Sequence, residues 1–124
     1  MPIISKEGEL LSPLFIVLQE SDGKFGDIKL KKINDLMKKY KMVNIYPVSS
    51  QSGKMNKALL EKWFKEIYFP NVGEKTLLLL DSWNAHKNTA LVEAATPKDK
   101  NVEIMIIPEG TTGICQPLDV YGFR

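Results

Sequence analysis

Two aspartates in the second half of the chain follow segments that would hold them firmly. Asp81 ends the apolar run LLLLD, and Asp119 follows the proline-containing stretch QPL. If the apolar strand expected over 102–107 pairs beside the first run, the loop after it can return Asp119 to Asp81, because functional groups gather beyond the carboxyl ends of such strands. Two neighbouring carboxylates repel unless a cation neutralises them. Mg²⁺ or Mn²⁺ suits such a pair, since hard cations take oxygen ligands.

This pair would have a defined chemistry. Two divalent ions about 3.5–4 Å apart can activate a water or hydroxyl and stabilise the leaving oxygen when a phosphodiester is cleaved. On spacing alone, capping of the turn after the strand is the favoured explanation of Asp81, and Ser82 and Asn84 would share that task. His86 is then an ordinary surface or core histidine. One histidine and one cysteine, Cys115, do not supply a zinc site.

Length and composition limit the class of protein. The chain has 124 residues, of which 44% are apolar and 26% charged, and this predicts a single globular domain over 1–124. Its net charge of +2 is too small to indicate a nucleic-acid binder by itself. No apolar run is long enough to span a bilayer, so we expect no membrane partner.

Hydrophobic periodicity predicts a hairpin and then a helix in the first third of the chain. The hairpin would join Pro2–Ser5 to Leu10–Gln19, and the helix would run from Asp27, as its cap, to Tyr40. Its apolar stripe would consist of Ile28, Leu30, Ile33, Leu36, Met37 and Tyr40. The lysines of this segment fall mainly off the stripe, and a solvated face explains Lys38, Lys39 and Lys41.

The rest of the chain alternates between the two periodicities. Strands are expected over 43–48, 77–81 and 102–107, and helices from Asn56 to Pro70 and over about 88–95. The apolar face of the helix after Asn56 would carry Leu59, Leu60, Trp63, Phe64 and Ile67. A hairpin followed by this alternation indicates one mixed sheet with helices packed on it, which is an α/β fold.

A polar loop, SSQSGK, ends at Lys54 and precedes the helix that contains Lys57. Its serines, Gly53 and lysines could contact DNA phosphate, and such a contact would be non-specific and salt-sensitive. A solvated loop that caps the following helix explains the same residues.

Two motifs, taken together and in order, resemble the DDE superfamily endonuclease domain of pogo/Tigger/jerky-like transposases. The first is LLLLDSWNAH, which contains Asp81 and His86, and the second is IIPEGTTGICQPLDVYGF, which contains Asp119. The upstream segments GELLSPLFIVLQESDGKFG and SSQSGKMNKALLEKWFKEIYFP are also similar to that family's middle region. The resemblance therefore covers nearly the whole chain.

The resemblance implies an RNase H-like mixed sheet flanked by helices, in which three acids bind two Mg²⁺ or Mn²⁺ ions and cut and join DNA. Asp81 matches the second acid and Asp119 the third, so both are expected to be catalytic residues and metal ligands. Asn84, His86 and Lys54 would orient these acids or contact DNA, and Gln116 would help to aim Asp119. The first strand and its acid have no match, which predicts a truncated core that is inactive alone.

Two functions remain as alternatives. The chain is either a DNA-binding fragment of a DDE-type transposase, ancestrally a divalent-metal-dependent DNA endonuclease and strand transferase, or a catalytically inactive nucleic-acid-binding module derived from a transposon. A small α/β protein that binds another ligand is disfavoured, because no phosphate-cradling glycine loop is evident. The resemblance also implies a nuclear location.

Overall fold

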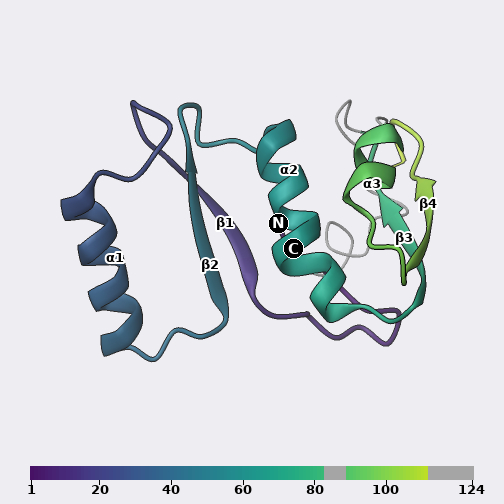
Figure 1. Cartoon of the computed structure of the whole chain (residues 1–124), viewed down its shortest axis with the longest axis horizontal. Coiled ribbons are helices and arrows are strands. Elements are labelled where there is room, and N and C mark those ends of the chain that lie inside the picture. The colour runs from purple at the N-terminus through teal and green to yellow at the C-terminus, as the bar shows by residue number, and fades with distance from the viewer. Residues whose placement is uncertain (83–88, 112–124) are drawn as a thin grey trace. The chain divides into compact units, whose positions relative to one another are not determined.

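The computed structural model describes residues 1–82 and 89–111, whose helices and strands are drawn in Figure 1. The chain divides into two compact units, Met1–Asn71 and Val72–Arg124. Each unit is built on one pair of parallel strands that are joined through a helix. The α/β class expected from the periodicity is confirmed, and the expectation of one domain over the whole chain stays a prediction.

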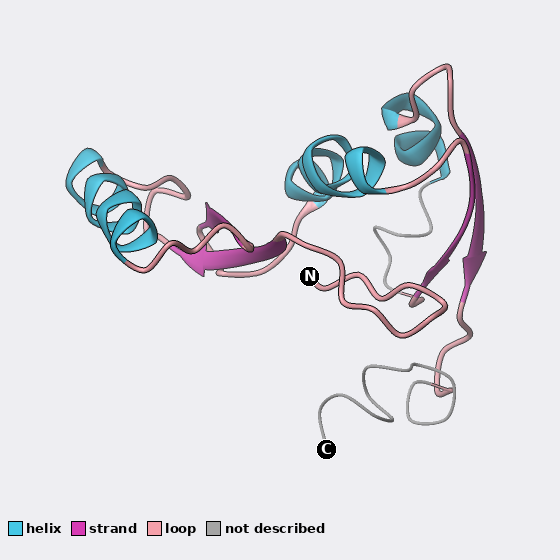
Figure 2. Cartoon of the chain, turned by 90° about the horizontal axis from the view of Figure 1, so that it is seen from below, coloured by secondary structure: helices cyan, strands magenta, loops and turns pink. Residues whose placement is uncertain are grey.

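The sheet of the first unit consists of β1 (Leu14–Gln19) and β2 (Ile45–Ser50). α1 (Asp27–Lys39) connects the two strands, which run parallel with Leu14 opposite Ile45. A parallel pair needs such a crossover, because the chain must return to the starting end of the first strand before it forms the second. Both strands therefore finish at the same edge, and the two turns that follow them leave from that edge (Figure 1). Figure 2 draws the strands in magenta and the helices in cyan, seen from below.

The predicted N-terminal hairpin is reduced to a single bridge. Ile4 pairs antiparallel with Leu10 around a turn in which Gly8 has a φ of 87°. No longer ladder forms among the described residues, and β1 begins directly after Pro13. A proline has no N–H to donate to a ladder, which accounts for the interruption. The expected hairpin was therefore too long.

α1 matches the predicted helix but is hardly buried. Gly26, rather than Asp27, occupies its N-cap, and Asp27 lies in the first turn, where a negative charge stabilises the helix dipole. None of its residues is buried, and the side chain of Ile28 is 88% exposed. The prediction that Ile28 belongs to the apolar stripe was wrong. Nine residues make two and a half turns, so Ile28 lies on the opposite side of the helix from Met37.

The second helix begins where it was predicted. The Asn56 side-chain oxygen accepts a hydrogen bond from the Leu59 N–H at 3.0 Å, which caps α2 (Lys57–Trp63). The helical path then widens into η1 (Phe64–Tyr68), a π-helical turn, and tightens into η2 (Phe69–Asn71), a 3₁₀ turn. These changes of pitch alter the rotation between successive side chains.

An aromatic cluster occupies the centre of this unit. Trp63, Phe64, Tyr68 and Phe69 are each at most 3% exposed. The Phe64 ring centroid lies 5.0 Å from that of Trp63, 5.7 Å from that of Tyr68 and 5.8 Å from that of Phe69. Ring pairs at these separations attract one another beyond the burial of their area. The predicted apolar face is confirmed as buried at Leu60, Trp63, Phe64 and Ile67.

The second unit has the same plan. β3 (Lys75–Leu80) and β4 (Asn101–Ile106) are parallel, with Leu80 opposite Ile106, and α3 (Thr89–Ala95) lies between them in the chain. The predicted strands and helix are thus present, with bounds that differ by one or two residues.

The LLLL run is buried on one face only. Leu78 and Leu80 are at most 8% exposed, whereas Leu77 and Leu79 are more than half exposed. Alternate residues of a strand point to opposite faces, so Leu78 and Leu80 share the buried face and Leu77 and Leu79 share the exposed one.

Phe64 tests the contribution of the aromatic cluster. We expect Phe64→Ala to lower the free energy of unfolding by about 3–5 kcal/mol, since it leaves a cavity among three rings. Urea denaturation followed by far-UV circular dichroism measures this loss. The control Ile28→Ala, at an exposed position, should change stability by less than about 0.5 kcal/mol. Equal effects of the two substitutions would contradict the proposed core.

Candidate metal and nucleic-acid site

Asp81 stands at the carboxyl end of β3. The two strands of this unit remain paired up to that point, because the Ile107 N–H donates to the Leu80 carbonyl oxygen at 2.7 Å. The buried side chains of Leu78 and Leu80 anchor the strand, and Asp81 is the next residue and is exposed. An anchored strand that ends in an accessible carboxylate is suited to bind a cation or a polar ligand at the sheet edge.

The segment after β4 leaves from the same edge. It forms a turn in which Gly110 has a φ of 80° and the Thr111 hydroxyl donates to the Pro108 carbonyl oxygen at 2.7 Å. Since β3 and β4 are parallel, Asp81 and the beginning of this segment lie at one end of the sheet. The loop that leads to Asp119 therefore begins at the same end of the sheet as Asp81, whereas Asp119 itself lies outside the described residues.

The other predicted site residues of this unit lie outside the described residues. They are Asn84, His86, Gln116 and Asp119. Their approach to Asp81 therefore stays a prediction. Within residues 1–82 and 89–111, no group of three or more histidine, cysteine, aspartate or glutamate side chains could hold a metal ion. The carboxylate of Asp81 has the oxygen chemistry that Mg²⁺ and Mn²⁺ prefer, but it needs further ligands from elsewhere.

Lys54, the remaining predicted residue, is exposed in the turn that follows β2. The Ser50 hydroxyl donates to the Lys54 carbonyl oxygen at 2.8 Å and fixes the backbone of this turn. Gly53 has a φ of 69°, a left-handed conformation that other residues adopt only with strain. The turn also packs closely on the end of β1, since a Cβ on Gly53 would lie 3.1 Å from the Gln19 Cβ.

A second turn of the same kind lies beside it. Gly23 has a φ of 70° and is followed by Lys24, just as Gly53 is followed by Lys54. The Ser49 hydroxyl donates to the Gly23 carbonyl oxygen at 3.2 Å and links β2 to this turn. Sequence reasoning missed Lys24, although the repeated Gly-Lys pair three residues before each helix was a visible signal.

A cavity beside these turns is lined by two lysines. This cavity of about 430 Å³ has Lys24, Lys62 and Phe25 in its lining and no carboxylate among its described lining residues. Close to the same edge, Glu20 forms an ion pair with Lys29 and so does not offset these lysines. Two lysines around an open cavity favour an anionic ligand such as a phosphate.

Comparison with known proteins identifies the family to which these features belong. The sequence profile described as DDE superfamily endonuclease matches residues 3–122, which is almost the entire chain. The chain belongs to the DDE superfamily endonuclease family. This membership confirms the resemblance at the level of the superfamily. It implies an RNase H-like fold, nuclease ancestry of the transposase type, a DNA substrate and the use of divalent metal ions.

Two further comparisons gave no relative from which a finer assignment follows. No curated protein and no solved structure matched this DDE endonuclease chain significantly. In the part of the chain that the structure describes, no helix is both long enough and apolar enough to cross a membrane.

Gly53 tests the geometry of the turn that carries Lys54. We expect Gly53→Ala to destabilise the chain by about 1–2 kcal/mol, because a Cβ is strained at this φ and meets Gln19. The shift in the urea unfolding midpoint measures it. Gly73→Ala is the control, since a Cβ at Gly73 meets no atom within 4 Å. If Gly53→Ala is as stable as this control, the turn does not require glycine.

Proposed function

We propose that this chain is the catalytic-core segment of a DDE transposase of the pogo/Tigger/jerky-like group. In this proposal it binds DNA and divalent cations, and it descends from a metal-dependent DNA endonuclease and strand transferase. The observation that carries the proposal is the exposed Asp81 at the carboxyl end of β3, in a chain whose family match extends over residues 3–122.

Asp81 and Asp119 are the proposed metal ligands and catalytic acids. The shared sheet edge of β3 and β4 supports this pairing, because the segment that leads to Asp119 starts beside Asp81. Bound Mg²⁺ or Mn²⁺ would supply a Lewis acid that activates a water or DNA hydroxyl and stabilises the leaving phosphate oxygen. We assign to Asn84, His86 and Gln116 the task of orienting these acids or contacting the substrate.

The proposed fold is an RNase H-like mixed sheet flanked by helices. The two parallel pairs, β1–β2 and β3–β4, with their crossover helices are compatible with the parallel part of such a sheet. These 124 residues carry matches to two of the three family acids. We therefore propose that they do not cleave DNA alone, because two carboxylates hold the cations with less negative charge than three.

The second candidate function is nucleic-acid binding without catalysis, in a module derived from a transposon. The paired Gly-Lys turns favour it, since they present Lys24 and Lys54 at one sheet edge and need no metal to contact phosphate. We include a nuclear location in this proposal, on the resemblance to transposases alone.

Metal binding tests the role of Asp81. We expect the chain to bind Mn²⁺, measured by the loss of the free-ion signal in electron paramagnetic resonance, and Asp81→Asn to weaken this binding at least about tenfold, because it removes one of two carboxylate ligands. Asp99→Asn, at another exposed aspartate of the same unit, is the matched control. Binding that is unchanged in Asp81→Asn would remove the metal-ligand assignment.

DNA binding tests the substrate assignment that the two candidate functions share. We expect the affinity for duplex DNA, measured by fluorescence anisotropy, to fall as salt rises with a log–log slope of about −0.9 for each phosphate contact. Asp81→Asn should leave this affinity intact in the absence of a divalent ion. An affinity that does not respond to salt would exclude phosphate contact, and cleavage by the wild-type chain alone would contradict the proposed inactivity.

A further inference from the structure

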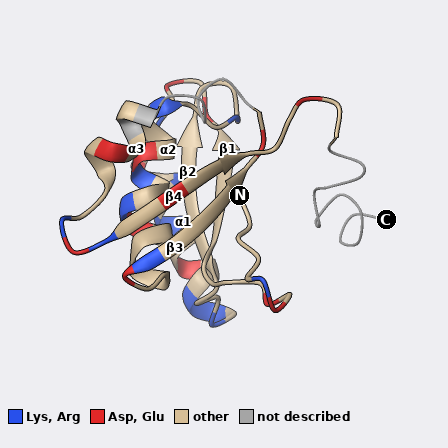
Figure 3. Ribbon diagram, turned by 90° about the vertical axis from the view of Figure 1, so that its right-hand side faces the viewer, with Lys and Arg blue, Asp and Glu red and all other residues tan. Residues whose placement is uncertain are grey.

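The strongest concentration of charge in the chain lies on α1 and directly after it. The segment 29–41 contains six lysines and one aspartate, so it carries +5, whereas the whole chain carries +2. The rest of the chain is therefore net negative. Figure 3 colours lysine and arginine blue and aspartate and glutamate red.

Most lysines of this helix form no ion pair with the part of the chain that the structure describes. Within the described residues, Lys29 is the one lysine of α1 that forms an ion pair, and it does so with Glu20. Among residues 1–82 and 89–111, no ion pair within 4 Å reaches the other four, Lys31, Lys32, Lys38 and Lys39. Like charges on neighbouring positions of a helix repel one another, so this face becomes more stable when an anion binds to it.

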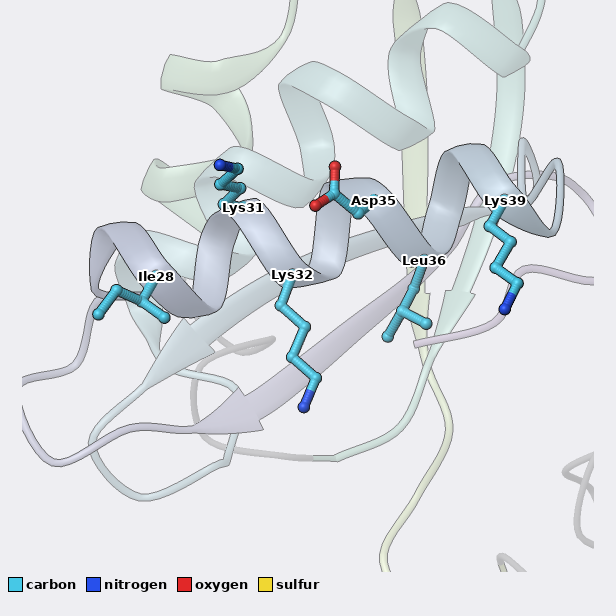
Figure 4. Close-up of a pocket in the computed structure, with 6 residues that line it drawn as sticks. All are labelled: Ile28, Lys31, Lys32, Asp35, Leu36 and Lys39. Carbon is cyan, nitrogen blue, oxygen red and sulfur yellow. The ribbon is translucent and has the colours of Figure 1, made fainter.

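The four lysines form two rows along the helix. Lys31 and Lys38 are seven residues apart, as are Lys32 and Lys39, and seven residues make nearly two turns and about 10.5 Å of rise. In Figure 4, Lys32 and Lys39 extend from one side of α1 together with Ile28 and Leu36. Lys31 extends in another direction, about 100° around the helix from Lys32, with Asp35 beside it.

The rise between two lysines of one row is close to a whole number of nucleotide steps along a DNA strand. A single DNA strand rises about 3.4 Å for each nucleotide, so 10.5 Å corresponds to about three nucleotides. Two ammonium groups in one row can therefore approach separate phosphates of the same strand. Lysine ammonium groups are compact charges on flexible stems, which suits contact with the backbone rather than reading of bases.

We infer that the outer face of α1 is a contact surface for the DNA phosphate backbone, formed by Lys31, Lys32, Lys38 and Lys39. The inference rests on the proposed DNA-binding function and adds the surface that carries it. A second copy of the chain does not fit here, because α1 against α1 would place lysines against lysines. The face holds one opposing charge, Asp35, which lines the same shallow cavity of about 450 Å³ as Lys31 and Lys32.

The test compares two fourfold variants with the same change of charge. We expect replacement of Lys31, Lys32, Lys38 and Lys39 by glutamine to lower duplex affinity at least about tenfold in low salt and to make the salt slope shallower by about 3–4. The control replaces Lys6, Lys65, Lys75 and Lys98 by glutamine, which are exposed lysines outside α1. It should lower affinity only slightly, through net charge.

Replacement of Asp35 should increase the affinity for DNA, a result that a variant with impaired folding would not give. We expect Asp35→Asn to raise duplex affinity about threefold or more, since it removes the negative group between the two rows. Circular dichroism of all variants checks that α1 is retained. An unchanged or weaker affinity in Asp35→Asn, with the helix intact, would overturn the inference.

The remaining outcomes separate the inference from the proposed function. If the wild-type chain binds DNA and the two fourfold variants bind equally, the inference fails while the proposed function stands. If the wild-type chain does not bind duplex DNA at any salt concentration, both fail. The variant Ile28→Ser with Leu36→Ser should bind DNA normally, and a loss as large as that of the lysine variant would instead indicate an apolar contact such as a partner protein makes.

Discussion

The parallel pairing of strands is the constraint on which the rest of this molecule depends. Each unit consists of one strand, one helical crossover and a second strand hydrogen-bonded to the first in parallel. Parallel neighbours end at the same edge of their sheet, so the polar residues that follow the two strands of one pair lie at that edge. Asp81 in one unit, and Lys24 and Lys54 in the other, reach their positions for this reason.

The position of Asp81 could be predicted from the sequence, because a run of four leucines before a carboxylate is a strong pattern for a strand and its end. The start of α2 could also be predicted from the sequence, since asparagine is a typical N-cap residue. The Asn56 side chain accepts a hydrogen bond from the N–H of Leu59, three positions later. In both cases the decisive interaction is local, involving residues that are neighbours in the chain.

The exposure of individual apolar residues was not predictable. Apolar side chains at Leu77 and Ile28 indicate burial in the sequence, yet both are exposed, because burial depends on which segments pack against a face and not on the face alone. The adjacency of the two Gly-Lys turns depends likewise on the register of β1 against β2. The chemistry expected of Asp119, Asn84, His86 and Gln116 rests on family membership, since these residues lie outside those that the structure describes.

The change of pitch after Trp63 restricts the chain in a further way. Ile67, Tyr68 and Phe69 are consecutive and all buried, whereas a regular helix with 100° between neighbours would spread them over 200° of its circumference. They lie where the π-helical turn passes into the 3₁₀ turn. This stretch is therefore sensitive to chain length as well as to side-chain size: one inserted or deleted residue would rotate every following side chain, whereas the loops of the same unit could absorb such an indel. Length variation among relatives should accordingly avoid residues 64–71.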